Sequence, residues 1–503
     1  MQLLNTLVRS FFLSQHKRLT TLVEKQCETQ DKLFKQLIKH CDKTLIGKSH
    51  GITSNMSVEQ FRRAMPIHDY PALMPYIERI INGEDNILWD KPIQWMAKSS
   101  GTTSAKSKYI PVSRDALYKN NYTAASDELI VYSHLFPNTQ MFGGKSVALG
   151  GSFHKMERNS DLRCGDVSAI LLANMPSLGD ILKAPRREIL LMQDWNQKLE
   201  LMASETYREN VTTISGVPSW MLLVLKRVME IAGKSNILEV WPNLEVYFHG
   251  GVAFAPYREE FKQIIPKDDF TYINTYNASE GFFGFQDTTA SDDMLLLCDH
   301  GVFYEFIPMD DIGNADDSQS VLLQDVKLGQ TYALVISTMA GLWRYKIGDT
   351  IEFTSLNPYR FKITGRTSHY INVFGEELIV DNADKAIQEA CRATHAILTD
   401  YTAAPVYLDA RDKACHEWAV EFSQEPDNLD LFTDILDQTL KQLNSDYEAK
   451  RTDNLLLKKP LVHVLPQGTF LKWLASRNKL GGQHKVPRLQ NDRSIITEIL
   501  ALI

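Results

Sequence analysis

Between residues 145 and 250 the sequence alternates short apolar runs with segments of helical periodicity, and this alternation most restricts the possible folds. The runs at 147–149, 169–172 and 244–248 predict buried strands, and the apolar spacing over 220–231 predicts a helix. Strands that alternate with helices are typical of an α/β sheet, which binds ligands at the carboxyl ends of its strands. We therefore expect an α/β fold with its site at strand ends.

The first ninety residues carry a different pattern, because apolar residues recur three and four apart with charges between them. This spacing predicts helices. Leu4, Leu7, Val8, Phe11 and Phe12 lie at helical spacing near the N-terminus, and no basic segment precedes them. We therefore expect an amphipathic helix packed on the body of the protein rather than an export signal.

The second half begins with a strand-rich region at 295–365, and a compact module follows Arg366. The elements expected here and just before are strands at 270–274, 301–307, 332–337 and 350–353, a solvated acidic loop at 309–320, a hairpin of 405–408 with 417–422, a helix at 431–447 and a strand at 461–465. The predicted fold is a large N-terminal α/β domain (1–366) with a strand-rich, β-barrel-like part, and a small C-terminal α+β domain (367–503).

Composition excludes several classes of protein. Lys and Arg number 54 against 62 Asp and Glu, a formal charge of -8, and nucleic-acid binders usually have a basic surplus. No stretch of about 18 apolar residues occurs, so no membrane span is expected. The six cysteines form no C-x-x-C pair, which is typical of reduced thiols in a cytoplasmic protein.

Several well-known catalytic motifs are absent. Gly-Lys-Ser occurs at 47, 144 and 233, but the glycine that a Walker A loop requires five positions earlier is replaced by Asp42, Thr139 and Val228. The sequence also lacks H-E-x-x-H, G-x-S-x-G and G-x-G-x-x-G. A metalloprotease, a serine hydrolase and a dinucleotide-binding enzyme are therefore not expected.

Two segments suggest a nucleotide. KSSGTTSAKSKY at 98–109 offers hydroxyls, backbone N–H groups and lysines to a polyphosphate, although a flexible linker has the same composition. His249, Gly250 and Gly251 follow a predicted strand, where glycines would let a ring or phosphate approach the backbone. A tight turn is the alternative there.

Three further segments carry chemically useful side chains. YNASEG at 276–281 places an aromatic ring, a hydroxyl and a carboxylate at a strand end, and such a carboxylate can hold Mg²⁺ beside phosphates. Asp349 in WRYKIGD is suited to accept two ribose hydroxyl protons. Lys485 lies in a glycine-led segment, GGQHKVPR at 481–488. Each has an ordinary alternative: a surface turn, a hairpin turn with a solvated carboxylate, and an exposed lysine.

Taken in order, these segments resemble the adenylate-forming enzymes, and more closely the Gretchen Hagen family of acyl acid amido synthetases. The resemblance covers about residues 15–490. It rests on SSGTT at 99–103, GVPSW at 216–220, YNASEG at 276–281, RYKIGD at 344–349 and GQHKVPR at 482–488. The chain looks like the bacterial members of this family whose substrate is unassigned.

The resemblance implies a two-step reaction. A carboxylate attacks the α-phosphate of ATP to give an acyl-adenylate and pyrophosphate, and an amine, usually an amino acid, then displaces AMP to form an amide. ATP and Mg²⁺ are the implied cofactors, and a small carboxylic acid and an amine are the implied partners. No protein partner is implied.

The resemblance also implies roles for individual residues. These are Ser99, Ser100, Gly101, Thr102 and Thr103 on the polyphosphate, Gly250, Gly251 and Tyr276 on the adenine, Ser279 and Glu280 on the α-phosphate and Mg²⁺, Asp349 on the ribose, and Lys485 on the charge that develops at the α-phosphate. Rotation of the C-terminal domain near Ser368 would set which half-reaction is possible. Val217 and Trp220 are candidates for the acyl pocket, although core packing also explains both.

The sequence departs from the family pattern at two places. Residues 372–377 are NVFGEE, where plant members carry a lysine, and Ser104 and Ala105 stand where relatives place a glycine. Two other functions also fit. One is an adenylating ligase that passes the acyl group to coenzyme A or another thiol, and the other is a non-catalytic nucleotide-binding or acid-binding relative.

Overall fold

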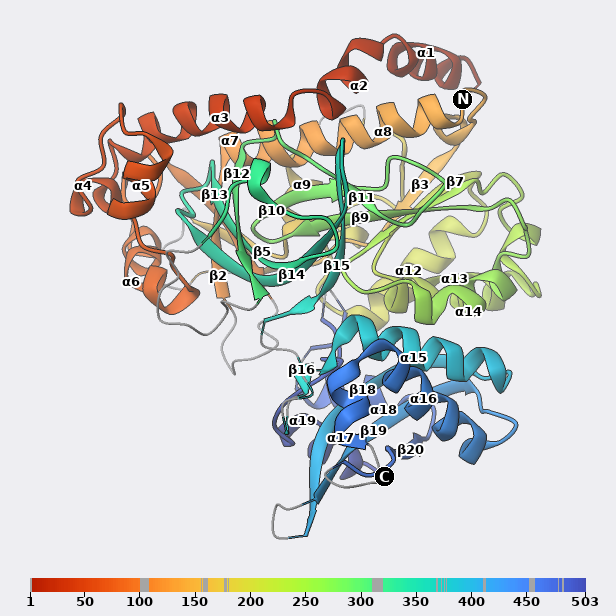
Figure 1. Ribbon diagram of the computed structural model, residues 1–503. Helices are drawn as coiled ribbons and strands as arrows, with labels where there is room; N and C mark the ends of the chain where they lie inside the picture. Colours follow the sequence, from red (N-terminus) through yellow and green to blue (C-terminus); the bar gives the residue numbers. More distant parts are fainter. Residues whose placement is uncertain are drawn as a thin grey trace.

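The computed structural model describes residues 2–503 except 100–107, 155, 157–161, 176–178, 180, 310–319, 368–369, 372, 375, 377, 410–412, 452–456, 478 and 482–483. It shows a large N-terminal part with mixed sheets and a smaller C-terminal part beside it (Figure 1). No helix within the described residues has the length and hydrophobicity that a membrane crossing requires. All six cysteines are described, and they are free thiols.

The first ninety residues form helices, as predicted. They are α1 (Gln2–Leu13), α2 (His16–Val23), α3 (Gln26–Cys41), α4 (Leu45–Ser49), α5 (Val58–Ala64) and α6 (Tyr70–Ile81). On α1, Val8 and Phe12 pack on the body. The prediction was wrong for Leu7 and Phe11, which are 61% and 60% exposed. The helix has apolar residues on more than one side, and only the side of Asn5, Val8 and Phe12 meets the body.

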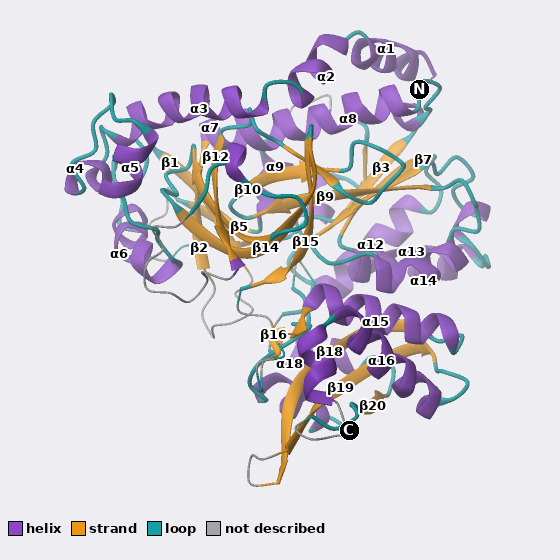
Figure 2. Cartoon of the chain, viewed as in Figure 1, coloured by secondary structure: helices purple, strands orange, loops and turns teal. Residues whose placement is uncertain are grey.

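One sheet contains most of the strands of the N-terminal part. Its order among the described residues is β12-β13-β14-β15-β11-β10-β9-β8-β7-β3-β6. The strands are β3 (Lys145–Ala148), β6 (Lys183–Ala184), β7 (Val211–Gly216), β8 (Val246–Gly250), β9 (Thr271–Ala278), β10 (Gly281–Phe285), β11 (Met294–Leu296), β12 (Val302–Pro308), β13 (Thr331–Thr338), β14 (Tyr345–Leu356) and β15 (Tyr359–Arg366). The pairs from β6 to β9 are parallel, and those from β9 to β12 are antiparallel. The strand-rich region is therefore continuous with the α/β half (Figure 2).

Helices and short turns complete this half of the molecule. They are α11 (Arg187–Leu190), α12 (Trp195–Thr206), α13 (Pro218–Ala232), η3 (Ile237–Glu239), η4 (Ala255–Tyr257), α14 (Arg258–Ile264) and η7 (Leu323–Asp325). The predicted helix at 220–231 is confirmed within α13, which begins at Pro218 and ends before Gly233. Proline fits the first helical turn, and Gly233 has the positive φ of 63° that ends many helices.

A second, smaller sheet lies beside the first and has the order β2-β1-β5-β4 among the described residues. Its strands and the neighbouring helices are β1 (Ile93–Ser99), β2 (Lys108–Ser113), β4 (Phe153–His154), β5 (Arg163–Gly165), α7 (Arg114–Ala116), η1 (Leu117–Tyr122), α8 (Thr123–Leu135), η2 (Met141–Gly143) and α9 (Val167–Ala173). The strand predicted at 169–172 was wrong, because these residues belong to α9. A short apolar run fits a buried helix as well as a strand, and Ala169, Ile170 and Leu172 are all buried.

The C-terminal module has its own three-stranded sheet and core. Its elements are β16 (Tyr370–Ile371), β17 (Leu378–Ile379), α15 (Val380–Ala393), β18 (Ile397–Asp409), β19 (Lys413–Gln424), α16 (Leu429–Leu443), α17 (Ser445–Arg451), β20 (Leu461–Leu465), α18 (Thr469–Ser476) and α19 (Ser494–Leu500). The predicted hairpin is confirmed, with Pro405 opposite His416. The predicted helix at 431–447 is divided, because Asn444 ends α16 and precedes α17.

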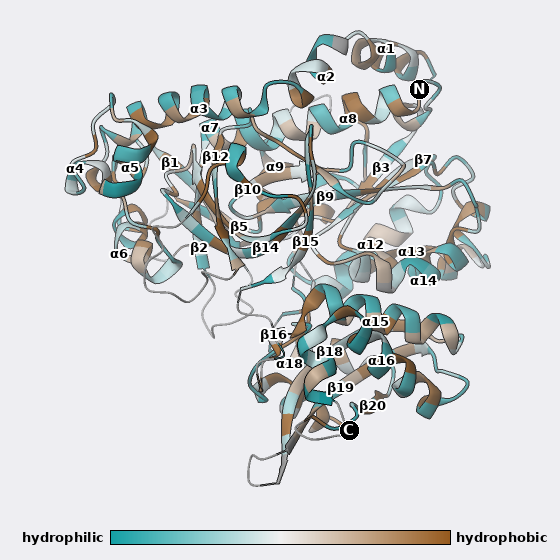
Figure 3. Cartoon of the chain, in the orientation of Figure 1, coloured by the Kyte–Doolittle hydropathy of each residue, from teal (hydrophilic) through white to brown (hydrophobic). Residues whose placement is uncertain are grey.

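Hydrophobic residues concentrate in the strands through the middle of the molecule, whereas α3 and α15 each show a hydrophilic side (Figure 3). One buried cluster joins the two parts of the chain. It combines Val217 and Trp220 of the N-terminal part with Val486, Phe470 and Ile496 of the C-terminal part. The two parts are therefore in direct contact along a buried seam.

Candidate active site

The strands β7 and β8 end side by side, and glycines follow at both ends. A Cβ atom at position 250 would lie 2.3 Å from the carbonyl oxygen of Thr275 on β9, which no side chain tolerates. Gly251 has a φ of 85°, in the left-handed region that favours glycine. Its position faces Lys485, whose Nζ atom would be 3.1 Å from a Cβ there. These glycines give a ligand access to the backbone at the end of the parallel strands.

The YNASEG segment forms the tip of the β9–β10 hairpin. Ala278 pairs with Gly281, so Ser279 and Glu280 are the two turn residues, and both are half-buried. The turn needs the φ of 157° that Gly281 adopts. Because the hairpin follows the last parallel strand, it carries the hydroxyl and the carboxylate to the same edge of the sheet as Gly250.

Asn120 fixes the hairpin immediately behind this tip. Its Nδ2 donates to the carbonyl oxygens of Phe282 and His300, both at 2.9 Å, and its Oδ1 accepts from the backbone N–H of Phe282 at 2.7 Å. Asn120 belongs to η1, a π-helical turn, and such turns are frequent at functional sites. This role could not be predicted from sequence, since a lone asparagine has no distinctive spacing.

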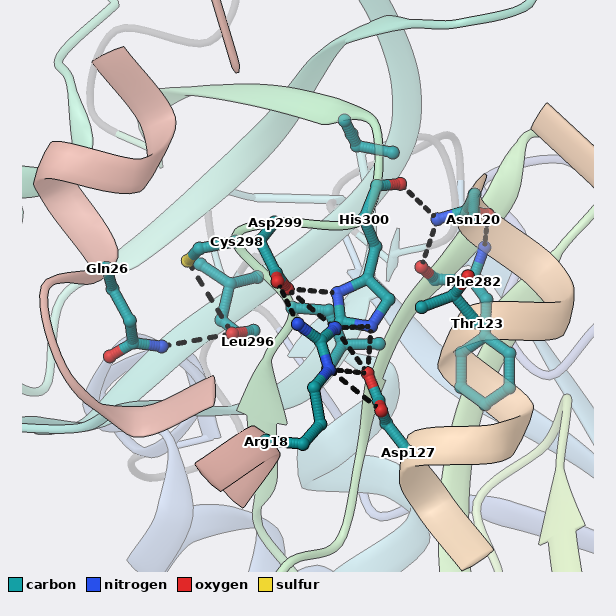
Figure 4. A network of polar contacts seen from close by, with 12 residues as sticks. Arg18, Gln26, Asn120, Thr123, Asp127, Phe282, Leu296, Cys298, Asp299 and His300 are labelled. Atoms are coloured by element: carbon teal, nitrogen blue, oxygen red, sulfur yellow. Dashed lines mark hydrogen bonds and ion pairs between the residues drawn. The ribbon is translucent and has the colours of Figure 1, made fainter. Parts of the chain in front are cut away.

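A buried ionic network continues from His300 (Figure 4). The Arg18 guanidinium lies between Asp127 and Asp299, with Nε 2.9 Å from both Asp127 oxygens and Nη1 2.5 Å from Asp299 Oδ2. His300 contacts the same two carboxylates, each at 2.8 Å. Burial alone would lower the pKa of His300, but its hydrogen bonds to Asp127 and Asp299 outweigh burial and raise the pKa. The network joins α2 and α8 to the chain just after β11.

Asp349 lies on β14 next to two partners. The Tyr276 hydroxyl donates to Asp349 Oδ2 at 2.5 Å, and Arg366 Nε lies 2.8 Å from Asp349 Oδ1. Arg366 stands directly opposite Asp349 in the β14–β15 register. The Tyr276 ring is buried edge-on against Phe283 and Phe361. Both oxygens of Asp349 are thus oriented by neighbours before any ligand arrives.

The charges around Glu280 set its protonation. Burial and the nearby charge of Asp349 raise its pKa to about 7, whereas Lys108 and Arg366 act in the opposite direction. Burial lowers the pKa of Lys108, and Glu280 opposes this change. Two carboxylates and two cations therefore share one partly buried region. Such a region suits a polyphosphate with its counter-ion.

Lys485 reaches this region from the C-terminal part. Its Nζ donates to the carbonyl oxygen of Gly251, across 234 positions of sequence. Burial and the neighbouring Arg366 charge lower the pKa of Lys485 to about 8, against the attraction of Asp349. The amine is thus held at the strand end in a state that is charged at neutral pH.

Arg488 ties the same segment to both parts of the chain. It donates to the Tyr257 hydroxyl at 2.8 Å and to the carbonyl oxygen of Tyr401 at 3.2 Å, and it also pairs with Asp400. Arg488 is 9% exposed, so this ion pair is buried. Arg488 lies in the GQHKVPR motif, but it was not singled out there, because nothing in the sequence indicates its partners.

The structure brings together six of the residues that the sequence singled out: Gly250, Gly251, Tyr276, Glu280, Asp349 and Lys485. Ser99 ends β1 opposite Lys108, beside the charge cluster, while Ser100, Gly101, Thr102 and Thr103 lie outside the described residues. Val217 and Trp220 are 8% and 2% exposed. Lys108 was noted from sequence only as one of the lysines of the 98–109 segment, and Arg366 was not assigned a role.

Comparison with known protein families determines the family of this chain. Residues 15–270 match the model of the GH3 family N-terminal domain, residues 295–366 the GH3 family central domain, and residues 381–494 the GH3 family C-terminal domain. The chain belongs to the GH3 family.

Curated GH3 relatives align over most of their length. Indole-3-acetic acid-amido synthetase GH3.3 of Arabidopsis thaliana is 24% identical, with 91% of this chain and 88% of the relative covered. The 4-substituted benzoates-glutamate ligase GH3.12 of the same plant is 21% identical, with 96% and 95% covered. Jasmonoyl–L-amino acid synthetase JAR4 of Nicotiana attenuata is 23% identical, with 91% and 90% covered.

Solved structures confirm the fold. The GH3.15 acyl acid amido synthetase in complex with 2,4-DB has a TM-score of 0.80 at 18% identity, with 98% of this chain and 96% of that chain covered. A 2-hydroxyisobutyryl-CoA ligase in the postadenylation state has a TM-score of 0.55 at 13% identity, with 95% and 92% covered. The chain therefore shares its overall fold with both of these solved structures.

Proposed function

We propose that this GH3 protein joins a carboxylic acid to an amine at the expense of ATP. In the first step an oxygen of the acid bonds to the α-phosphorus, and the bond to the β-phosphate breaks to release pyrophosphate. In the second step the amine nitrogen bonds to the acyl carbon, AMP leaves with the C–O electron pair, and the nitrogen loses a proton. The proposal rests mainly on one observation: Lys485 hydrogen-bonds to the carbonyl oxygen of Gly251, close to the carboxylates of Glu280 and Asp349.

The chemistry of the first step explains the charges in the site. Two anions must approach each other, so catalysis requires donors and cations on the phosphates more than a protein nucleophile. In the proposed arrangement Lys485 neutralises the charge that develops at the α-phosphate, Ser279 donates to the same phosphate, and Asp349 accepts from the ribose hydroxyls. Residues 99–103 bind the polyphosphate, and Gly250, Gly251 and Tyr276 line the adenine.

Glu280 is the proposed ligand of Mg²⁺. The described residues contain no group of three or more His, Cys, Asp or Glu side chains that could hold a metal. A magnesium ion that takes most of its ligands from phosphates and water needs only one or two carboxylates, and the half-buried Glu280 carboxylate at the hairpin tip meets this need. When bound, the ion would neutralise phosphate charge.

The acid and the amine are small molecules in this proposal. The relatives are named for indole-3-acetic acid, benzoates and jasmonate on the acid side, and for glutamate or amino acids on the amine side. We propose an amino acid as the amine here. Val217 borders the proposed site next to Gly251 and is the candidate for the acyl wall. No protein partner is part of the proposal.

The domain boundary at 366/367 and the movement of the C-terminal domain also belong to the proposal. The separate core of the C-terminal module supports the boundary. Because Lys485 and Arg488 come from that module while Gly251 and Tyr257 come from the N-terminal part, movement of the module would remove the lysine from the site. A cytoplasmic location stays a prediction that rests on the unpaired cysteines.

A ligase that transfers the acyl group to coenzyme A is the second candidate. The likeness to 2-hydroxyisobutyryl-CoA ligase favours it at the level of fold. A non-catalytic binding protein is less consistent with the site, because pure nucleotide binding requires neither Lys485 nor its contact with Gly251.

Pyrophosphate release from ATP and Mg²⁺ tests the proposal, with a panel of aromatic, fatty and terpenoid acids and hydroxylamine as a general acceptor. Acid-dependent release is expected. The best acid is then offered amino acids or coenzyme A. An amide with an amino acid supports the amido synthetase, a thioester would replace it with the second candidate, and ATP binding without release for any acid would contradict both.

A further inference from the structure

Two tryptophans of the N-terminal part lie beside the segment that carries Lys485. Trp195 begins α12, and Trp220 lies in the first turn of α13. Their rings meet edge to face, with centroids 4.6 Å apart and an interplanar angle of 68°. They are 7% and 2% exposed. Such a pair is rigid, because each ring fixes the orientation of the other.

Gly481 approaches Trp195 more closely than any other residue type could. A Cβ atom at position 481 would lie 2.8 Å from Trp195 Cε3 and 3.0 Å from Trp195 Cβ. Gly481 also has a φ of 78°, in the left-handed region. The C-terminal backbone therefore rests directly against the indole ring at this point.

Trp220 contacts the residue before the lysine. Its indole Nε1 donates to the carbonyl oxygen of His484 at 3.0 Å, across 264 positions of sequence. Lys485 follows and reaches the Gly251 carbonyl oxygen. Val486 comes next and is buried in the same cluster as Val217 and Trp220. Three consecutive C-terminal residues are thus held by the N-terminal part.

We propose that Trp195 and Trp220 form a seat that positions Lys485, so that Trp220 is a positioning residue for adenylation. This inference rests on the proposed function and deepens it. The indole N–H of Trp220 donates to the carbonyl oxygen of His484, so the ring holds the C-terminal segment in place. This changes the role that the sequence suggested for Trp220, which was the wall of the acyl pocket.

The seat has a specific consequence for the two half-reactions. Lys485 acts when charge develops at the α-phosphate during adenylation, and in the proposed cycle the C-terminal module moves and takes Lys485 out of the site before the amine attacks. Weakening the seat should therefore slow the first step and spare the second. A purely structural role in the core would lower stability and affect both steps alike.

The first test replaces Trp220 by Phe, which keeps an aromatic ring and removes the N–H. Acid-dependent pyrophosphate release should slow about 3- to 10-fold, the scale of one neutral hydrogen bond. ATP affinity and amide formation from supplied acyl-adenylate should stay within about twofold of the parent. Trp241→Phe is the matched control, because Trp241 Nε1 makes the same kind of bond to the Thr206 carbonyl oxygen at 3.0 Å within the N-terminal part.

The second test approaches the seat from the other side. Gly481→Ala should slow pyrophosphate release more than Gly468→Ala does. Gly468 has a similar φ of 82°, but its Cβ would meet nothing within 4 Å. The comparison separates the collision with Trp195 from the backbone strain that both alanines share.

Amide hydrogen exchange of the peptide containing His484 and Lys485 gives a readout that does not depend on catalysis. It should be about 3- to 10-fold faster in Trp220→Phe than in Trp241→Phe. Equal exchange in the two variants, or equal slowing of both half-reactions by Trp220→Phe, would overturn the inference. If the parent protein adenylates no acid at all, the proposed function fails, and the exchange result still decides whether the seat exists.

Discussion

The Tyr276 hydroxyl donates a hydrogen bond of 2.5 Å to Asp349, although 73 positions of sequence separate the two residues. They come from the two motifs that the sequence assigned to adenine and to ribose. Arg366 engages the other oxygen of Asp349 at 2.8 Å. The two motifs are therefore already joined in the protein itself, and in the proposed function the ribose would bind to a carboxylate whose orientation is fixed.

Asp349→Asn should weaken ATP binding by about 1.5–3 kcal/mol, the scale of hydrogen bonds to a charged group. The amide keeps the shape of the carboxylate but loses the charge and one of the two acceptor oxygens. Isothermal titration calorimetry with ATP measures the change. Asp269→Asn is the control, since the Asp269 side chain is 84% exposed and remote from these contacts. Unchanged ATP affinity in Asp349→Asn would remove Asp349 from the ribose role.

The raised pKa of Glu280 predicts that the rate of adenylation depends on pH near and below neutrality. Its pKa is raised to about 7 by burial and by Asp349, so the carboxylate is mostly protonated below that pH. A Mg²⁺ ligand must be ionised. The rate of adenylation should therefore rise as the pH increases through about 7. Pyrophosphate release followed from pH 6 to 8 tests this, and Glu280→Gln should give a slow rate without this rise. The same rise in Glu280→Gln would assign it to another group.

The lowered pKa of Lys485 predicts that the rate of adenylation decreases at alkaline pH. Its pKa is lowered to about 8 by burial and by Arg366, so it loses its charge as the pH rises through that value. Adenylation should then fall. Lys485→Ala should slow adenylation about 100- to 1,000-fold, as loss of a transition-state donor does in other enzymes, while ATP binding stays nearly intact. Lys472→Ala, at an exposed lysine of α18, is the control. An unchanged rate in Lys485→Ala would remove Lys485 from the proposed role at the α-phosphate.

The alternation of strands and helices was enough to predict the α/β fold with a site at strand ends, and the resemblance carried by the order of the motifs brought Lys485 to the same site as Gly250 and Glu280. Parallel strands end at one edge, so residues that follow them are close whatever the details of packing. Side-chain partners could not be predicted in this way. Arg488 contacts Tyr257 and Asp400, which come from the two different parts of the chain. Contacts between residues so far apart leave no local pattern in the sequence.

Errors in the sequence interpretation have similar causes. The apolar residues at 169–172 were predicted to form a strand but belong to α9. They would be buried in a helix or in a strand, so hydrophobicity alone did not separate the two. Trp220 was a candidate for the acyl pocket and nothing in the structure tests that role, but its contact with His484 became visible only in three dimensions. Asn120 was overlooked because its role depends on three-dimensional contacts. Its side-chain amide both donates to and accepts from the backbone of Phe282 in the hairpin.

The network of Arg18 predicts a loss of stability without a loss of nucleotide binding. Arg18→Met removes one of the two cations that hold Asp127 and Asp299. Because His300 remains and the Arg18 side chain is 24% exposed, the loss of unfolding free energy should be about 1.5–3 kcal/mol, the scale of hydrogen bonds to charged groups. The hairpin tip is separated from Arg18 by His300 and Asn120, so ATP affinity measured below the unfolding temperature should stay close to that of the parent. Urea unfolding measures the stability. Arg79→Met, which removes an exposed ion pair with Glu84, is the control and should have little effect.

The same network makes stability depend on pH through His300. Because its pKa in the folded protein is raised above the ordinary value of 6.5, the folded state binds the proton more tightly than the unfolded chain does. The resulting stabilisation is complete below about pH 6.5 and declines as the pH rises through the raised pKa. His300→Gln should be less stable than the parent at pH 6 and should show a smaller decline toward pH 9. Parallel urea curves at these pH values measure both effects. An equal decline in the two proteins would mean that His300 does not carry the proton that binds Asp127 to Asp299.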